Sequence, residues 1–165
     1  MEIECNIVLT GAGATALMDL WMVVRRKALG TAMPDYALVG RWIAHMPGGR
    51  FSHTAIGKSP ARRGERVIGW AAHYLIGIAF AAVPPLMLGA AWFDRPTIFP
   101  ALATGLLTLA VPFLVMQPAM GAGFAASRTP NPSAARLQSL TTHVIFGAGL
   151  FLAAEVLRTT RGGVS

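Results

Sequence analysis

The chain of 165 residues has little charge, a single cysteine and no basic residue before its first apolar run. Only 13% of its residues are charged and 54% are hydrophobic, whereas an average soluble domain is about 25% charged. The lone Cys5 excludes an internal disulfide and any metal cluster built from several cysteines. The start MEIEC lacks the positive charge that opens a cleaved secretory signal, so we expect the first apolar run to be retained.

Four long apolar runs are what the sequence has instead. Runs of about eighteen or more apolar residues match the ~20 residues that a helix needs to cross about 30 Å of hydrocarbon. They cover residues 7–24, 67–92, 98–120 and 137–157. We therefore predict an all-α integral membrane bundle of four transmembrane helices, forming a single domain over residues 1–165. Kinks are expected where proline interrupts the second and third runs, at Pro84, Pro85, Pro112 and Pro118.

The basic residues predict how the chain is oriented. Nine of the fourteen Lys and Arg lie in the loop of residues 25–66, two lie between the third and fourth runs, and three lie on the other side. By the positive-inside rule both of those loops are cytoplasmic, and both termini are periplasmic in a bacterial inner membrane. Anionic lipid headgroups at the cytoplasmic face are the partner that this charge predicts. No aromatic residues alternate with the basic ones as a single-strand platform requires, so a nucleic-acid partner is rejected.

The first loop contains a pattern typical of a short helix. Between Pro34 and Pro47, apolar residues recur at broadly helical spacing, and Trp42 is among them. We predict an interfacial helix on the inner leaflet, with Trp42 at the level of the headgroups.

Two pairs of segments indicate a duplicated helical hairpin. RVIGWAAHYLIG at 66–77 and RLQSLTTHVIFG at 136–147 share Arg, His and Gly at positions seventy residues apart. MDLWM at 18–22 and MQPAM at 116–120 share the pattern M-[D/Q]-x-x-M. The two hairpins would run in the same direction, which is the parallel kind of membrane repeat.

One polar side chain from each run is expected at a shared depth. Asp19 lies about 9 Å along its helix from Arg25, and each intramembrane histidine lies about 10 Å from the arginine that precedes its helix. We expect Asp19, His73, Gln117 and His143 to face one another, because ionisable groups in hydrocarbon need a partner or a wet cavity.

Two roles for this cluster follow from membrane physics. The four side chains fix helix register as a hydrogen-bonded network, or they bind and translocate a small solute, proton or metal ion. In the first case the protein is a structural or regulatory subunit of a membrane complex or a homo-oligomer. Gly11, Thr15 and Asp19 recur every four residues and predict a close approach by another helix.

A metal or haem group is the third alternative, and it would make the protein a redox protein or enzyme. Met18 and Met22, like Met116 and Met120, are spaced to share a helix face. With His73 and His143 they suit Cu(I), whereas two histidines and a carboxylate suit iron or zinc. For haem b, the two histidines are the axial ligands, and Gly77 and Gly147 leave room for the porphyrin.

Loop residues provide a candidate rim for the site. His45 and His53 of the first loop cover its mouth, although lone loop histidines are more often solvated. The second loop is rich in small residues that let it fold back, which would bring Ser127, Arg128 and Asn131 close.

Several motifs together resemble a known family. They are GAGATALMDLW, GRWIAHMPGGRFSHTAIGKSP, GWAAHY and PFLVMQPAMGAGFAASRTPNP. On these the chain is similar to the DUF2938 family of small bacterial membrane proteins. The resemblance implies a multi-pass inner-membrane protein, and it supplies no catalytic residues.

Overall fold

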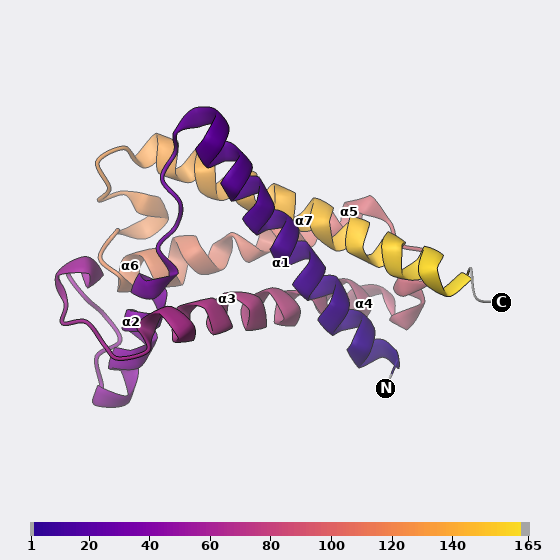
Figure 1. The fold of residues 1–165 in the computed structure, drawn as a ribbon, viewed down its shortest axis with the longest axis horizontal. Coiled ribbons are helices and arrows are strands. Elements are labelled where there is room, and N and C mark those ends of the chain that lie inside the picture. The colour runs from indigo at the N-terminus through magenta and orange to yellow at the C-terminus, as the bar shows by residue number, and fades with distance from the viewer. Residues whose placement is uncertain (1, 163–165) are drawn as a thin grey trace. The chain divides into compact units, whose positions relative to one another are not determined.

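A computed structural model describes residues 2–162, which are all-helical, with no strand among them (Figure 1). The elements are α1 (Glu2–Leu29), α2 (Tyr36–His45), η1 (Met46–Gly48), η2 (Ile56–Lys58), α3 (Glu65–Ala81), α4 (Val83–Leu88), η3 (Ala90–Phe93), α5 (Ile98–Thr108), η4 (Pro112–Met116), α6 (Gln117–Ala119), η5 (Phe124–Ala126) and α7 (Pro132–Gly162).

Four stretches are long and apolar enough to cross a membrane. The first and fourth contain their expected spans in full, and the second and third cover most of theirs. The four stretches run over Glu2–Leu29, Glu65–Leu88, Ile98–Ala119 and Pro132–Arg161. The first and last helices extend beyond the apolar residues that predicted them. In α1 the extension is favourable, because acidic residues lie in its first turn and basic residues in its last, where they complement the helix dipole.

Proline interrupts the second and third spans, as predicted. The second is divided between α3 and α4, with Pro84 in the first turn of α4, where its missing N–H costs nothing. In the third, Pro112 opens the π-helical segment η4 between α5 and α6. The second span ends at Leu88 rather than Trp92, because Gly89 leaves the helix with a φ of 84°. Trp92 lies in the short turn η3.

The described chain divides into two units. Unit 1 contains residues 2–32, 74–108 and 141–162, and unit 2 contains residues 33–73 and 109–140. The division falls between α1 and α2, inside α3, directly after α5 and inside α7.

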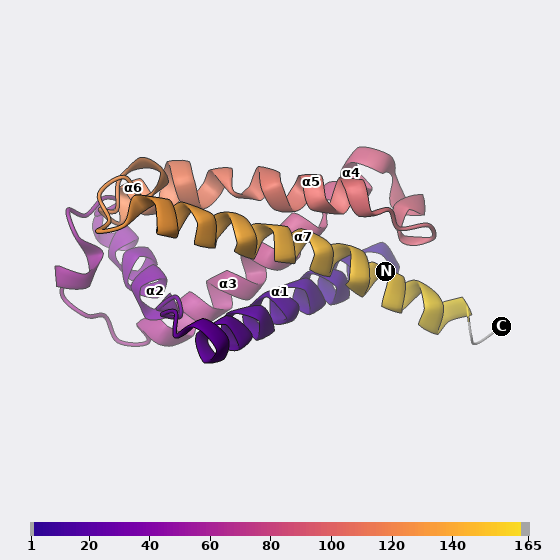
Figure 2. The ribbon, with the colours of Figure 1, turned by 90° about the horizontal axis from the view of Figure 1, so that it is seen from above.

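Glycines let the helices of unit 1 approach closely. A Cβ on Gly11 would lie 2.4 Å from the Cα of Ile78, and one on Gly105 would lie 2.4 Å from the backbone oxygen of His143. The expected close approach at the Gly11 stripe is therefore confirmed. The helices α1 and α7 also lie side by side, as both views show (Figures 1 and 2), since a Cβ on Gly149 would meet the Cα of Ala14 at 2.9 Å.

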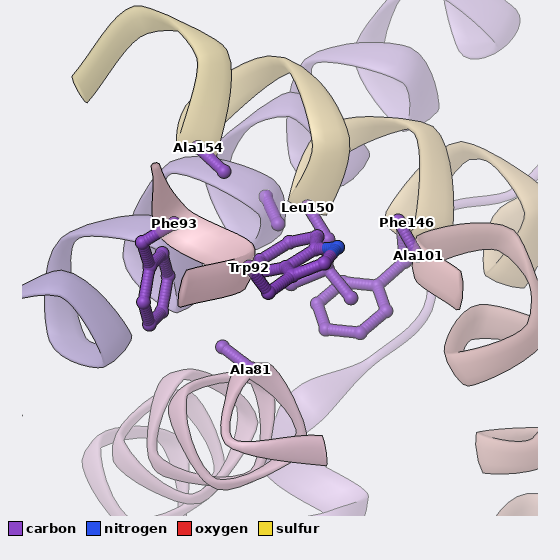
Figure 3. Packing of buried hydrophobic residues seen from close by; sticks show 8 residues of the cluster. Ala81, Trp92, Phe93, Ala101, Phe146, Leu150 and Ala154 are labelled. Atoms are coloured by element: carbon purple, nitrogen blue, oxygen red, sulfur yellow. The ribbon is translucent and has the colours of Figure 1, made fainter. Parts of the chain in front are cut away.

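Trp92 closes the apolar core of unit 1. The core consists of Ala14, Ala81, Trp92, Phe93, Ala101, Phe146, Leu150 and Ala154. Figure 3 shows the Trp92 ring in the middle of this cluster, with Phe93 on one side and Phe146 on the other. Its side chain is buried although its turn η3 joins two helices. Its indole Nε1 has no hydrogen-bond partner among the described residues, so the ring contributes through packing.

In unit 2 the short helix α2 packs against the start of α3. The predicted loop helix is thus present, and Asp35 caps it by accepting a hydrogen bond from the Ala37 N–H at 3.0 Å. A Cβ on Gly40 would lie 1.7 Å from the Glu65 carbonyl oxygen. One on Gly69 would lie 1.8 Å from the Tyr36 carbonyl oxygen. Two glycines therefore set the contact between α2 and α3.

Candidate functional site

Asp19 and Tyr74 form a polar pair between α1 and α3 in unit 1. The Tyr74 hydroxyl donates a hydrogen bond to Asp19 Oδ2 at 3.0 Å. Sequence reasoning missed this partner. The signal that was present is that Tyr74 follows His73 directly and is one of only two tyrosines in the chain.

His143 and Thr108 form a second polar pair of unit 1, between α7 and α5. The Thr108 hydroxyl donates to the Gly105 carbonyl at 2.7 Å and lies 3.0 Å from His143 Nδ1. Because the hydroxyl proton is used on Gly105, the Thr108 oxygen accepts, and Nδ1 of His143 carries the proton. This hydrogen bond fixes the tautomer of the imidazole.

His73 belongs to unit 2 and lies in an aromatic group. Its ring stacks on Tyr36, with centroids 4.1 Å apart and an interplanar angle of 26°. Trp70 lies edge-on to the same histidine, with ring centroids 5.8 Å apart. The repeat predicts His73 and His143 to be equivalent, yet their described neighbours differ. Since Asp19 and His143 belong to unit 1, and His73 and Gln117 to unit 2, the cluster of all four stays a prediction.

The metal alternatives receive little support. Among residues 2–162 no three His, Cys, Asp or Glu side chains form a group that could hold a metal ion. The set of two histidines and a carboxylate that iron or zinc would need is therefore not found there. Met18 packs against the apolar core of unit 1, and Met22 is only 2% exposed. For these two methionines, packing explains the spacing; a role for Met116 and Met120 as ligands stays untested.

The haem alternative is wrong about the space beside the glycines. A Cβ on Gly77 would lie 2.1 Å from the hydroxyl oxygen of Thr15, and one on Gly147 would lie 2.8 Å from the backbone oxygen of Ala101. Neighbouring helices already fill the volume that a porphyrin ring would need. The residues present therefore do not fit haem b at these positions.

The loop histidines are buried and packed together rather than solvated, and their predicted place at the rim of the four-residue cluster stays a prediction. His45 is 1% exposed and His53 is 7% exposed. Their rings meet edge to face, with centroids 5.1 Å apart. His45 uses both nitrogens, with Nε2 at 3.0 Å from the Pro60 carbonyl and Nδ1 at 3.3 Å from the Arg62 guanidinium.

Two buried polar atoms of unit 2 have no hydrogen-bond partner among the described residues. They are Nε2 of His53 and Oε1 of Gln117. Their segments are held together by backbone hydrogen bonds: the His53 N–H donates to Ala119 at 2.7 Å, and the Ile56 N–H donates to Met120 at 3.0 Å. We call these two side chains the His53–Gln117 site. A buried polar atom left unpaired costs about 1–3 kcal/mol, so a site with two of them calls for an explanation.

The electrostatics of His53 favour a neutral ring. Burial lowers the pKa of its imidazole from the ordinary value, and the charges of His45 and Arg50 lower it further. The Arg50 carbonyl opposes this shift in part. Nδ1 lies 2.9 Å from the Ser59 hydroxyl. If Nδ1 donates to Ser59, Nε2 is an acceptor. If the Ser59 hydroxyl donates to Nδ1, Nε2 carries the ring proton and is a donor.

An ion pair holds the loop around this site. Arg41 binds Glu65 in a bidentate fashion, with distances of 2.8 and 2.7 Å. Its remaining nitrogen donates to the Ser59 carbonyl at 3.1 Å. Glu65 also accepts from the Arg62 N–H at 2.8 Å. Arg41 thus connects α2, the segment after η2 and the first turn of α3.

For the second loop, the rim role of Ser127, Arg128 and Asn131 stays a prediction. Asn131 caps α7, since its side-chain oxygen accepts from the Ala134 N–H at 3.1 Å. Ser127 and Arg128 are exposed. The loop does fold back on itself, because the Arg128 N–H donates to the Ala122 carbonyl at 2.8 Å.

Comparison with known proteins gives one match. Residues 8–157 match the model of a protein family described as "Protein of unknown function (DUF2938)". No curated protein and no solved structure matches the chain.

Proposed function

Since the chain belongs to the DUF2938 family over residues 8–157, whose description names no activity, we propose a function from the two unpartnered buried polar atoms of unit 2. The protein is a multi-pass membrane protein that binds a small polar solute at the His53–Gln117 site. The observation that carries this proposal is the pair of buried, unpartnered atoms, His53 Nε2 and Gln117 Oε1.

The chemistry of the two atoms sets the kind of solute. The Gln117 oxygen can only accept, so the solute must donate at least one N–H or O–H. His53 either donates to the solute or accepts from it, depending on its tautomer, and its lowered pKa keeps it neutral near pH 7. Small amides, amines and alcohols meet these requirements.

The polar pairs of the membrane helices support a different role for Asp19 and His143. Each is already hydrogen-bonded to a neighbouring helix, through Tyr74 and Thr108. Satisfied interhelical pairs of this kind fix helix register and contribute on the order of 0.6 kcal/mol each. This favours binding at the loop over translocation through an intramembrane cluster. A structural or regulatory subunit of a membrane complex is the second candidate.

The orientation is part of the proposal. The excess of Lys and Arg in the loop of residues 25–66 supports a cytoplasmic His53–Gln117 site and periplasmic termini in a bacterial inner membrane. Cys5 tests it, because it is the only cysteine and is exposed. A membrane-impermeant maleimide should label Cys5 from the periplasmic side. It should not label a Cys5→Ser, Ser127→Cys variant until the membrane is opened.

Solute binding is tested on detergent-purified protein with acetamide, ethanolamine and glycerol as probes. At least one probe should raise the unfolding temperature in a dose-dependent manner, and Gln117→Leu should abolish the rise. The matched control is Gln138→Leu, which changes the only other glutamine, in the same unit, and should keep the response. If no probe acts on the wild type, and Gln117→Leu unfolds at a higher temperature than the wild type, the amide is simply unsatisfied and the proposal fails.

A further inference from the structure

An apolar groove runs along the seam between α1 and α7 in unit 1. Its walls extend from Leu9 to Leu17 on α1 and from Gly149 to Leu157 on α7, and every lining residue is hydrophobic or glycine. At its floor the helices touch, since a Cβ on Gly13 would lie 3.1 Å from the Cβ of Ala153. Each wall is about 12 Å long.

Charged groups of both signs lie at one end of the groove. About one helical turn beyond Leu157, Arg161 donates a hydrogen bond to Asn6 of α1, which ties the two helices together past the end of the groove. This arginine is exposed and keeps further N–H donors for a second ligand. The neighbouring charges are the Arg158–Glu155 pair on α7 and the acidic residues Glu2 and Glu4 that open α1.

We propose that the groove binds one zwitterionic phospholipid with an ammonium headgroup. An acyl chain lies along the seam, the phosphate binds Arg161, and the ammonium is drawn to the carboxylates that open α1. Two features favour a lipid over a helix of a second copy. A helix with its side chains is about 10–12 Å wide, whereas this seam closes at Gly13 and Ala153. The mixed charges at the end complement a headgroup that carries both signs.

The test uses delipidated protein in mild detergent, with palmitoyl-oleoyl phosphatidylethanolamine as the probe and native mass spectrometry to count bound lipid. The wild type should bind one molecule of the added lipid. Val156→Trp fills the groove and should weaken binding at least tenfold. Arg161→Gln should weaken it about tenfold, as expected for loss of one charge-assisted hydrogen bond. The matched control is Leu107→Trp on α5, which is 64% exposed, comparable to the 60% of Val156, and lies outside the groove.

Several results would overturn the proposal. Equal binding by Val156→Trp and the wild type, or equal loss in Leu107→Trp, would show that no groove site exists. Phosphatidylglycerol binding as tightly as phosphatidylethanolamine would refute the zwitterionic headgroup. Should Val156→Trp fail to fold, a phospholipid with a photoreactive acyl chain gives a second readout on the wild type. Its crosslinks should fall within residues 9–17 and 149–157, and crosslinks spread evenly over all helices would refute the site.

Discussion

Replacing Gly40 by alanine should separate α2 from α3. A Cβ at this position would lie 1.7 Å from the Glu65 carbonyl oxygen, whereas ordinary contact begins at 3.4 Å. The two helices must therefore move apart locally by about 1.7 Å, the difference between these two distances. The obstructing atom belongs to the backbone of α3, so no side-chain rotation relieves the clash.

The cost follows from this displacement. Overpacking typically destabilises by about 1–3 kcal/mol, and a backbone clash belongs at the top of that range. The same displacement would lengthen the Arg41–Glu65 contact of 2.7 Å beyond hydrogen-bonding distance. Without the clash, alanine would stabilise α2 by about 1 kcal/mol relative to glycine. The sign of the effect therefore tests the packing.

The assay is unfolding of the purified protein in mixed micelles at increasing SDS, with tryptophan fluorescence as the probe. The control is Gly48→Ala, where an added Cβ meets nothing within 4 Å. We expect Gly40→Ala to unfold at a clearly lower SDS fraction and Gly48→Ala to remain within about 0.5 kcal/mol of the wild type. A Gly40→Ala protein as stable as the wild type, or more stable, would refute the contact between α2 and α3.

Three further predictions concern the polar groups. Burial lowers the pKa of His53 in the folded state, so the unfolded chain binds the proton more readily; stability should be full above pH 6.5 and fall as the pH drops below it. The His53→Gln variant has no imidazole to protonate, so its stability should fall less than that of the wild type below pH 6.5. An equal fall in the two proteins would contradict the prediction. A double-mutant cycle of Asp19→Ala and Tyr74→Phe should give a coupling of about 0.6 kcal/mol, and additive effects would contradict the hydrogen bond. Arg41→Met should lower the unfolding temperature because Glu65 loses its bidentate partner. Adding Glu65→Gln to that variant should lower the unfolding temperature little further. If the two substitutions lower it additively, Arg41 and Glu65 do not act as a pair.

The two hairpins share one feature that bears on the predicted duplication. In each, the candidate span that carries the histidine meets the preceding candidate span at the glycine four residues later. Gly77 lies against Thr15 of α1, and Gly147 lies against Ala101 of α5. The histidines themselves have different neighbours. The duplication stays a prediction, and the glycines are its best structural support.

The sequence by itself determined the four long helices, the loop helix and the breaks in the second and third spans. Each of these depends on local properties: the length of an apolar run, helical spacing between Pro34 and Pro47, and the missing N–H of proline. The close approach at Gly11 was also predictable, because a stripe of small residues on a membrane helix has few other uses.

Tertiary structure decided which polar groups are satisfied. Depth along a helix can be counted from the sequence, but a partner depends on helix rotation and crossing, which no local pattern fixes. Asp19 was correctly expected to need a partner, and the fold supplied Tyr74. His53, predicted as a rim residue with solvation as the alternative, is buried because its backbone N–H binds Ala119, more than sixty residues away in the chain. Burial of a loop side chain depends on such distant contacts, so only the folded structure could point to the His53–Gln117 site.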